Sequence, residues 1–400
     1  MPTWMDDDLN DRRRRGLYRR RRHLQSAPGV RVRLRGREHV NFASNDYLDL
    51  SADPRLARAA TRAARRYGCG AGASPLVCGH LPPHRALERA LAEWEGTEAA
   101  LVFSSGFAAN LAVLSAAAGR ADAVFSDELN HASLIDGCRL SRARVHVYRH
   151  GDTDHLHDLL RRAGPAARRR LIVSDTVFSM DGDLAPLADL GDLARRHDCL
   201  LLLDEAHATG VLGPHGRGAT ELLPGGVALD ADRLIKVGTL SKALGAQGGF
   251  VCGPRRLIRW LINFARPYVF STALAPPTAA AARRAVAIVR EEPERRQQLQ
   301  GLAQLLRDRL RELGYPESGS RCQIVPLVVG NARAAVRLSR RLEERGLLVP
   351  AIRPPSVPEG TARLRISLTA GHTEDDVLRL VSVLRELRPS APVRLGKVGP

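Results

Sequence analysis

The chain has 400 residues and a formal net charge of +18, with 44% hydrophobic and 26% charged residues. This composition excludes a disordered chain, a collagen-like repeat and a coiled coil, and the length predicts two or three domains. Its six cysteines are too few for a disulfide scaffold and form no C-x-x-C pair, so we expect reduced thiols and no metal site.

Residues 1–41 are predicted to form a basic N-terminal arm with arginine runs at Arg12–Arg15 and Arg19–Arg22. Elsewhere the arginines are scattered, which favours a general composition bias and predicts no nucleic-acid partner. A basic, non-catalytic nucleic-acid-binding protein is the alternative from another class, because it would explain the charge alone. No apolar segment follows the arginine runs, and the uncharged window 99–119 is broken by small polar residues. We therefore expect a cytoplasmic protein with no signal peptide and no membrane partner.

Between residues 42 and 277, short apolar runs alternate with helical patterns, which predicts a large α/β domain with a mostly parallel central sheet. The expected buried strands are 101–103, 123–125, 144–148, 171–174, 199–203, 234–237 and 250–252. Pro276-Pro277 marks a break, and long helical patterns follow at 278–313. Strands at 323–329, 347–352 and 363–368 with helices at 332–345 and 374–387 then predict a smaller C-terminal α+β domain over residues 278–400.

The apolar strand 199–203 ends in Asp204, and His207 follows three residues later. Ligands collect at the carboxyl ends of strands in open α/β sheets, so both side chains are candidates for chemistry. A helicase-type ATPase is excluded, because a P-loop needs Gly-Lys-Ser or Gly-Lys-Thr and no lysine of this chain is followed by either hydroxyl residue. The remaining alternative is an aspartate that only caps the next turn.

Only three of the 61 basic residues are lysines, namely Lys236, Lys242 and Lys397. A lysine can form a Schiff base once its ammonium is desolvated, whereas an arginine stays protonated. Lys236 lies within an apolar strand and Lys397 near the C-terminal end, which leaves Lys242 as the candidate for covalent catalysis. The alternative is an ordinary solvated charge.

The strand ending at Phe103 leads into small residues and then a helical pattern. Free backbone N–H groups at such a helix start bind anions, and Ser105 adds a hydroxyl, so the turn predicts a phosphate site. A tight strand-to-helix turn that needs small residues is an equal alternative. The segment 68–73 looks like a dinucleotide fingerprint, but a helical pattern precedes it, so we expect a loop there. His146 and His150 share i,i+4 spacing, but on a predicted strand end, which argues against a metal site.

A phosphate turn, a strand-end aspartate and a Schiff-base lysine together are the parts of a pyridoxal phosphate site. The chain resembles the α-oxoamine synthase family of fold-type I pyridoxal phosphate-dependent enzymes from about residue 19 to residue 388. The blocks that carry the resemblance are 41–48, 130–134, 177–183, 204–207 and 239–245. The segment 351–365 is most similar to members that condense L-alanine with a pimeloyl thioester, of coenzyme A or acyl carrier protein, in biotin synthesis. Members that join glycine to acetyl-CoA (glycine C-acetyltransferase) or succinyl-CoA, or serine to a long acyl chain, are the alternatives.

The resemblance implies a role for each matching residue. Lys242 would bind the cofactor covalently and transfer protons, Asp204 would pair with the ring nitrogen, and His131 would stack on the ring. His207 and Ser179 would lie at the ring hydroxyl. The residues expected at the phosphate are Ser105, Gly106, Phe107 and Thr239, with Ser271 and Thr272 from the neighbouring subunit of a homodimer.

The resemblance also implies a substrate site. Arg365 would bind the amino-acid carboxylate, with Asn45 and Ser356 lining the same pocket, and Arg19 would lie near the acyl substrate. Cys78 and His80 depart from the family pattern, which has Ser or Thr and often Tyr at these positions. The basic arm is expected to meet phosphates of coenzyme A or an acidic acyl carrier protein.

Overall fold

The computed structural model describes residues 3–163, 167–223 and 229–387, and Lys397 lies outside them. The chain divides into two compact units. The terminal unit comprises Met1–Asp49, Met180–Gly182 and Gln297–Pro400, and the sheet unit comprises Leu50–Ser179 and Asp183–Arg296. No helix in the described part of the chain is both long and apolar enough to span a membrane.

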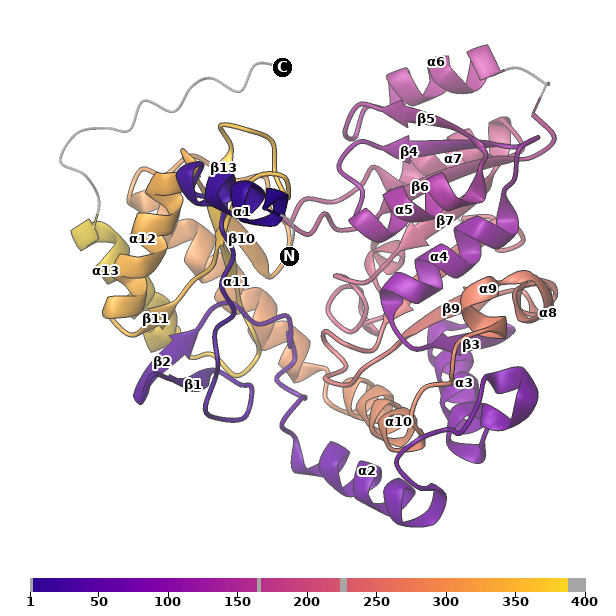
Figure 1. The fold of residues 1–400 in the computed structure, drawn as a ribbon, viewed down its shortest axis with the longest axis horizontal. Coiled ribbons are helices and arrows are strands. Elements are labelled where there is room, and N and C mark those ends of the chain that lie inside the picture. Colours follow the sequence, from indigo (N-terminus) through magenta and orange to yellow (C-terminus); the bar gives the residue numbers. More distant parts are fainter. Residues whose placement is uncertain (1–2, 164–166, 224–228, 388–400) are drawn as a thin grey trace. The chain divides into compact units, whose positions relative to one another are not determined.

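The sheet unit is built on seven strands in the order β3-β9-β8-β7-β6-β4-β5 (Figure 1). Their bounds are β3 Ala99–Phe103, β4 Ala123–Asp127, β5 Arg144–Tyr148, β6 Arg170–Asp175, β7 Leu200–Asp204, β8 Leu234–Thr239 and β9 Gly249–Gly253. Only β9 is antiparallel to its neighbours β3 and β8, and the other pairings are parallel. The predicted mostly parallel sheet is confirmed.

Helices surround this sheet: α2 Pro54–Tyr67, α3 Pro82–Glu95, α4 Gly106–Ala117, α5 Ala132–Ser141, α6 Thr153–Ala163, α7 Leu187–Arg196, α8 Arg255–Phe264, α9 Arg266–Val269 and α10 Pro276–Glu291. A π-turn at Pro75–Gly79 and a 3₁₀ turn at Ala219–Leu222 complete the unit. Alternate residues of a strand point to opposite faces. Ile235 and Val237 of β8 accordingly join the apolar core beneath α4, α5 and α8, whereas Lys236 contacts Glu95 of α3.

The boundary between the units differs from the one expected at Pro277. Helix α10 packs against α2 and α3, so the first part of the expected C-terminal domain belongs to the sheet unit, which ends at Arg296. The break marked by Pro276-Pro277 is real, but it is a helix start, because proline is well suited to the first turn.

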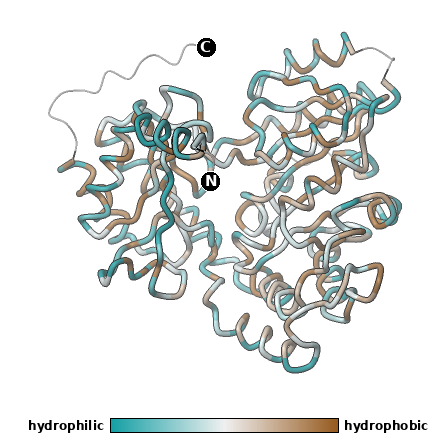
Figure 2. The backbone as a smooth tube through the Cα atoms, in the orientation of Figure 1, coloured by the Kyte–Doolittle hydropathy of each residue, from teal (hydrophilic) through white to brown (hydrophobic). Residues whose placement is uncertain are grey.

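The terminal unit joins the two ends of the chain. Its elements are α1 Trp4–Arg14, β1 Arg31–Leu34, β2 Arg37–Asn41, β10 Ile324–Gly330, α12 Ala332–Glu344, β11 Leu347–Leu348, β12 Ala351–Ile352, β13 Ala362–Ser367 and α13 Glu374–Leu387. It also contains α11 Glu294–Glu312 from Gln297 onward. Strand β2 pairs with β11, and β13 lies between β10 and β12. The N-terminal residues are therefore part of this unit instead of a separate arm, although most residues of α1 are hydrophilic (Figure 2).

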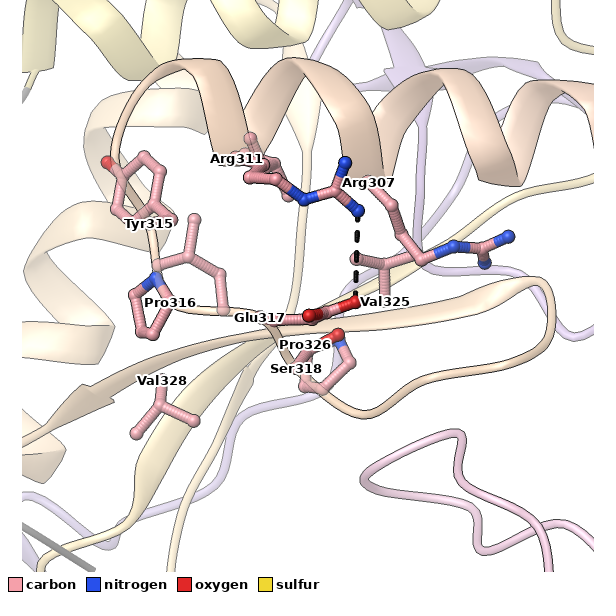
Figure 3. A pocket seen from close by; sticks show the side chains of 11 residues that line it. Arg307, Arg311, Tyr315, Pro316, Glu317, Ser318, Val325, Pro326 and Val328 are labelled. Carbon is pink, nitrogen blue, oxygen red and sulfur yellow. Dashed lines mark ion pairs between the residues drawn. The ribbon is translucent and has the colours of Figure 1, made fainter.

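A small pocket in the terminal unit lies between the end of α11 and β10 (Figure 3). Arg311 and Glu317 form an ion pair of 3.7 Å at its edge, and Pro326 and Val328 form part of its apolar lining. None of the residues expected in the cofactor or substrate site lines this pocket.

The buried ion pair between Lys236 and Glu95 gives a first prediction. Lys236 Nζ lies 2.6 Å from Glu95 Oε2, and both side chains are buried. Lys236→Met leaves an uncompensated carboxylate and should lower the free energy of unfolding, measured by urea denaturation, by about 3–5 kcal/mol. The double variant Lys236→Met with Glu95→Leu should recover most of this loss. A Lys236→Met variant as stable as the wild type would contradict the ion pair between Lys236 and Glu95.

A second prediction concerns pH. His150 Nδ1 lies 3.0 Å from Asp127 Oδ1, and its Nε2 lies 2.8 Å from Asp183 Oδ2. Burial alone would lower the pKa of His150, but hydrogen bonds to the two carboxylates outweigh it and raise the pKa to about 10. The stabilisation is therefore complete below about pH 6.5, the usual histidine pKa, and is lost as the pH rises toward 10.

Urea midpoints across this pH range provide the measurement. His150→Gln should be less stable than the wild type at pH 6, and the difference should narrow steadily toward pH 10. A difference that stays constant over that range would show that the histidine is neutral in the folded protein.

Candidate active site

Lys242 lies in the loop that follows β8, and its amine meets an imidazole. Its Nζ is 2.8 Å from Nε2 of His207, which is itself buried after the end of β7. Gly245 closes this loop with φ +59°, and an added Cβ would lie 2.5 Å from the backbone nitrogen of Ser51. The loop conformation therefore requires glycine. Because Lys236 is paired with Glu95, Lys242 is the lysine of the sheet unit that is the candidate for covalent catalysis.

Asp204 ends strand β7 and is 4% exposed. Its Oδ1 accepts a hydrogen bond of 2.8 Å from the backbone N–H of Ala206, and its Oδ2 accepts one of 2.6 Å from the side chain of Asn110. A buried carboxylate at a strand end is thus held by two donors from different elements. It does more than cap the next turn, which was the alternative interpretation of this residue.

His131 is connected to Asp204 through a short chain of hydrogen bonds. Asn110 Nδ2 also donates to Ser133 Oγ at 2.9 Å, and Ser133 Oγ lies 2.7 Å from His131 Nδ1. The imidazole is exposed, and its ring centroid lies 6.4 Å from that of Phe107 in an edge-on contact. These bonds fix the orientation of an imidazole that still has an accessible face.

The expected phosphate turn is the start of helix α4. Ser105 is its N-cap and accepts from Ala108 N at 3.0 Å, while the first-turn N–H groups have no intrahelical acceptor. An added Cβ on Gly106 would lie 3.3 Å from Thr239, so the turn and Thr239 are adjacent. Asn110 lies one turn further along the same helix. Helix α4 therefore connects an anion-binding end to the Asp204 carboxylate.

Asp175 was not identified from the sequence. It ends β6 and is paired in register with Asp204 on the adjacent parallel strand, and its Oδ2 accepts a 2.6 Å hydrogen bond from the backbone N–H of His131. Burial raises the pKa of Asp175 well above its usual range, and the negative charge of Asp204 raises it further. When two carboxyl groups lie side by side, repulsion between their negative charges favours the protonated, neutral form of one of them. Its position at a second strand end could have identified it, whereas the role of Asn110 depends on tertiary packing.

Three further candidates lie in the sheet unit. Ser179 follows β6 within the segment closed by the bridge between Val177 and Leu184. Ser271 and Thr272 are exposed between α9 and α10. Their expected roles at the ring hydroxyl and at a neighbouring subunit's phosphate stay predictions.

The expected substrate residues all belong to the terminal unit, and two of them meet. Arg365 is 5% exposed, and its Nη1 donates to Asn45 Oδ1 at 3.0 Å and to Ser367 Oγ at 2.8 Å. Its Nη2 lies 3.3 Å from the Tyr47 hydroxyl. A guanidinium held in a fixed orientation is suited to binding a carboxylate through two parallel hydrogen bonds.

Arg19 and Ser356 are both exposed and share a neighbour in Arg353. The backbone N–H of Ser356 donates to Arg353 O at 3.1 Å, and the guanidinium groups of Arg19 and Arg353 lie close enough to repel one another. The structure thus brings Asn45 to Arg365, while Arg19 and Ser356 each lie near Arg353.

The sheet unit supplies the donor set that pyridoxal phosphate needs. It offers an amine for the aldehyde, a buried carboxylate for the ring nitrogen and a helix N-terminus for the phosphate. The phosphate turn leaves no room for a side chain at position 249, because an added Cβ on Gly249 would lie 2.5 Å from Gly106 Cα. The residues therefore fit the expected cofactor.

A third prediction tests the neutral form of Asp175. Asp175→Asn keeps an acceptor for His131 N–H, so its unfolding free energy and its affinity for pyridoxal phosphate should stay near wild type. Asp175→Ala leaves a buried N–H without a partner and should cost about 1–3 kcal/mol in stability and weaken cofactor binding. Urea denaturation and fluorescence titration of the apoprotein measure both effects. An Asn variant as impaired as the Ala variant would show that the negative charge is required.

Comparisons with known proteins agree with this geometry. The family model described as aminotransferase class I and II matches residues 37–384. A relative from Anaeromyxobacter sp. strain Fw109-5 named 8-amino-7-oxononanoate synthase is 53% identical over 384 residues, which cover 96% of this chain and 95% of the relative. Another with that name, from Anaeromyxobacter dehalogenans strain 2CP-1, is 49% identical over 397 residues, or 98% of each chain.

The solved structure of serine palmitoyltransferase from Sphingomonas wittichii has a TM-score of 0.90 with this chain at 32% identity. The alignment covers 96% of this chain and 98% of that one. Together with the mostly parallel seven-stranded sheet, this likeness confirms the predicted fold-type I architecture. The chain belongs to the aminotransferase class I and II family.

Proposed function

We propose that this chain is a pyridoxal phosphate-dependent acyltransferase that condenses L-alanine with a pimeloyl thioester to give 8-amino-7-oxononanoate, carbon dioxide and the free thiol, a step of biotin synthesis. The observation that carries the proposal is the meeting of Lys242 with His207 beside the strand-end carboxylate of Asp204. The product is the one in the name shared by relatives about half identical to this chain over nearly its full length, and the substrates are those that the family resemblance implies.

The cofactor-binding roles are those that the family resemblance implies, and the contacts in the sheet unit support them. Lys242 would bind the cofactor aldehyde through Nζ, and Asp204 would pair with the ring nitrogen. His131 would lie on the ring, with His207 and Ser179 at the ring hydroxyl. The phosphate would be bound by Ser105, Gly106, Phe107 and Thr239. When bound, the cofactor withdraws electrons and stabilises negative charge on the α-carbon of the amino acid.

The remaining chemistry belongs to residues of the chain and to the substrates. Arg365, supported by Asn45, pairs with the alanine carboxylate and orients the Cα–H bond. Once the alanine amine has replaced Lys242 at the aldehyde, the freed Nζ removes that proton. The α-carbon then bonds to the thioester carbonyl as the C–S bond breaks, and the leaving thiolate takes a proton from water. Loss of the carboxylate as carbon dioxide and return of a proton from Lys242 complete the reaction. Arg19 and Ser356 are assigned to the acyl substrate.

The choice among sister reactions depends on the relatives. The serine palmitoyltransferase neighbour shares the fold at 32% identity, whereas the 8-amino-7-oxononanoate synthases reach 49–53%. This difference favours L-alanine and a pimeloyl thioester over serine with a long acyl chain. The glycine C-acetyltransferase alternative is not favoured.

We further propose a homodimer in the cytoplasm. Ser271 and Thr272 are exposed hydroxyls, as expected of residues that serve the phosphate of a second copy. Cys69 and Cys78 are exposed free thiols, which persist in a reducing compartment.

Isotope release tests the reaction directly. The purified protein, loaded with pyridoxal phosphate, is given L-alanine labelled with ¹³C at the carboxyl carbon together with pimeloyl-CoA. We expect labelled carbon dioxide and 8-amino-7-oxononanoate in equal amounts, and neither product from Lys242→Ala, because that variant lacks the proton-transfer amine. Turnover of glycine with acetyl-CoA but not of L-alanine with pimeloyl-CoA would move the assignment to the sister enzyme.

A further inference from the structure

A four-residue turn after β6 carries Ser179, one of the residues assigned to the cofactor. The backbone N–H of Phe178 donates to Asp183 O at 3.1 Å, and the bridge between Val177 and Leu184 closes the segment one step further from the turn. We define the Ser179 turn as the residues between these contacts, 179–182. The position of the serine hydroxyl therefore depends on what holds this turn.

His150, which follows β5, is the first anchor of the Ser179 turn. Its Nε2 lies 2.8 Å from Asp183 Oδ2, and its ring meets the buried ring of Phe178 edge-on, with the centroids 4.3 Å apart. One imidazole thus contacts the residues on both sides of the turn. Burial would lower the pKa of His150, but the carboxylates of Asp127 and Asp183 raise it to about 10, so the ring is positively charged at neutral pH. An ion pair therefore attaches the turn to the end of the sheet.

Arg363 of β13 is the second anchor. The tip of the turn, Met180–Gly182, belongs to the terminal unit, and there the Arg363 guanidinium pairs with Asp181. The backbone N–H of Arg321 also donates to Gly182 O at 3.0 Å. Gly182 has φ +73°, and an added Cβ would collide with a backbone oxygen of the terminal unit, so this position requires glycine. The turn is therefore held from two directions by oppositely charged pairs and by close backbone packing.

The two buried arginines of β13 have different partners. Arg363 and Arg365 are spaced i and i+2, which places them on the same face of the strand. The charge of Arg363 is matched by Asp181, and its Nε donates to Thr361 O at 3.0 Å. Arg363 is therefore not assigned to the substrate carboxylate, and its ion pair points to a role in holding the turn.

A fixed turn matters because a serine hydroxyl makes a single, directional contact. A turn that moved freely would have to lose conformational entropy when the cofactor binds, and that loss would offset most of one hydrogen bond. Anchors on both sides of the turn remove this cost before binding, which is the general advantage of a preorganised site.

We propose that His150 and Arg363 are positioning residues that hold the Ser179 turn so that the serine hydroxyl meets the ring hydroxyl of the bound cofactor. This inference rests on the proposed function and adds two residues to it. Both act through Ser179, and neither is assigned a contact with the cofactor or the substrates. The alternative is that the two anchors contribute to the stability of the fold alone.

The test compares pyridoxal phosphate with its analogue in which hydrogen replaces the ring hydroxyl, by fluorescence titration of the apoprotein. Ser179→Ala, His150→Gln and Arg363→Met should each weaken binding of pyridoxal phosphate by about three- to tenfold, the size of one lost hydrogen bond. Their affinity for the analogue should change less than about twofold, because that contact is missing in the wild type as well.

Combined and conservative variants give a second readout. Adding His150→Gln to Ser179→Ala should not weaken binding of pyridoxal phosphate further, because both changes remove the same contact. Arg363→Lys keeps the ion pair with Asp181 and should retain most of the affinity. Asp183→Asn keeps an acceptor for the imidazole but loses the charge, and it replaces His150→Gln if that variant folds poorly.

Matched controls break similar ion pairs that involve no residue of the turn. His215 Nδ1 lies 2.8 Å from Glu221 Oε1 in the sheet unit, and Arg31 Nη2 lies 2.7 Å from Asp376 Oδ1 in the terminal unit. His215→Gln and Arg31→Met should leave both affinities near those of the wild type. Circular dichroism and urea midpoints check folding in each variant.

Hydrogen exchange of the apoprotein tests the anchors without the cofactor. Peptides that cover residues 177–184 should exchange faster in His150→Gln and in Arg363→Met than in the wild type. Unchanged exchange, or equal weakening of pyridoxal phosphate and its analogue, would overturn the proposal. If the wild type binds no pyridoxal phosphate, the proposed function fails, while the exchange rates still decide whether the two residues hold the turn.

Discussion

The hydrogen bond from Asn110 to the buried carboxylate of Asp204 is the contact on which the rest of the site depends. It ties the carboxyl end of a central strand to the first turns of α4, and the same amide also holds Ser133 and, through it, His131. A helix whose N-terminus attracts an anion is thereby fixed at a set distance from a carboxylate that attracts a cationic ring nitrogen. A cofactor with a phosphate at one end and a basic ring nitrogen at the other matches that polarity.

The two lysines of the sheet unit show how neighbouring groups decide the role of one residue type. Lys236 is enclosed between the sheet and α3 and is neutralised by Glu95, so its charge contributes to stability. Lys242 is six residues further along the chain, past the end of β8, and its Nζ lies 2.8 Å from the imidazole of His207. An amine next to an imidazole is suited to losing and regaining protons, which covalent catalysis requires.

Much of the site could be predicted from the sequence because its signals are local. A strand that ends in Asp204 and a lysine retained among arginines can both be identified without a structure, and so can the small residues before α4. The partners of these residues could not be predicted, since Asn110 reaches Asp204 across 94 positions of sequence. Asp175 could be predicted only in part. It also ends a strand, but its importance depends on the strand register that places it beside Asp204.

The division of the chain was harder to predict for a similar reason. Pro276-Pro277 predicts an interruption, but sequence alone does not distinguish a domain boundary from a helix start, and here α10 packs back on α2 and α3. The N-terminal residues likewise lack a strong periodic pattern, and β2 is defined by its pairing with β11 from the other end of the chain. Contacts between distant segments set both boundaries, and they leave little trace in local composition.

The proposed function depends most on Lys242 as the residue that holds the cofactor. The most direct measurement is borohydride reduction of the protein loaded with pyridoxal phosphate, followed by peptide mass spectrometry. We expect a single phosphopyridoxyl group, located on Lys242. A label on Lys236 or Lys397, or a protein that takes up no cofactor, would contradict it.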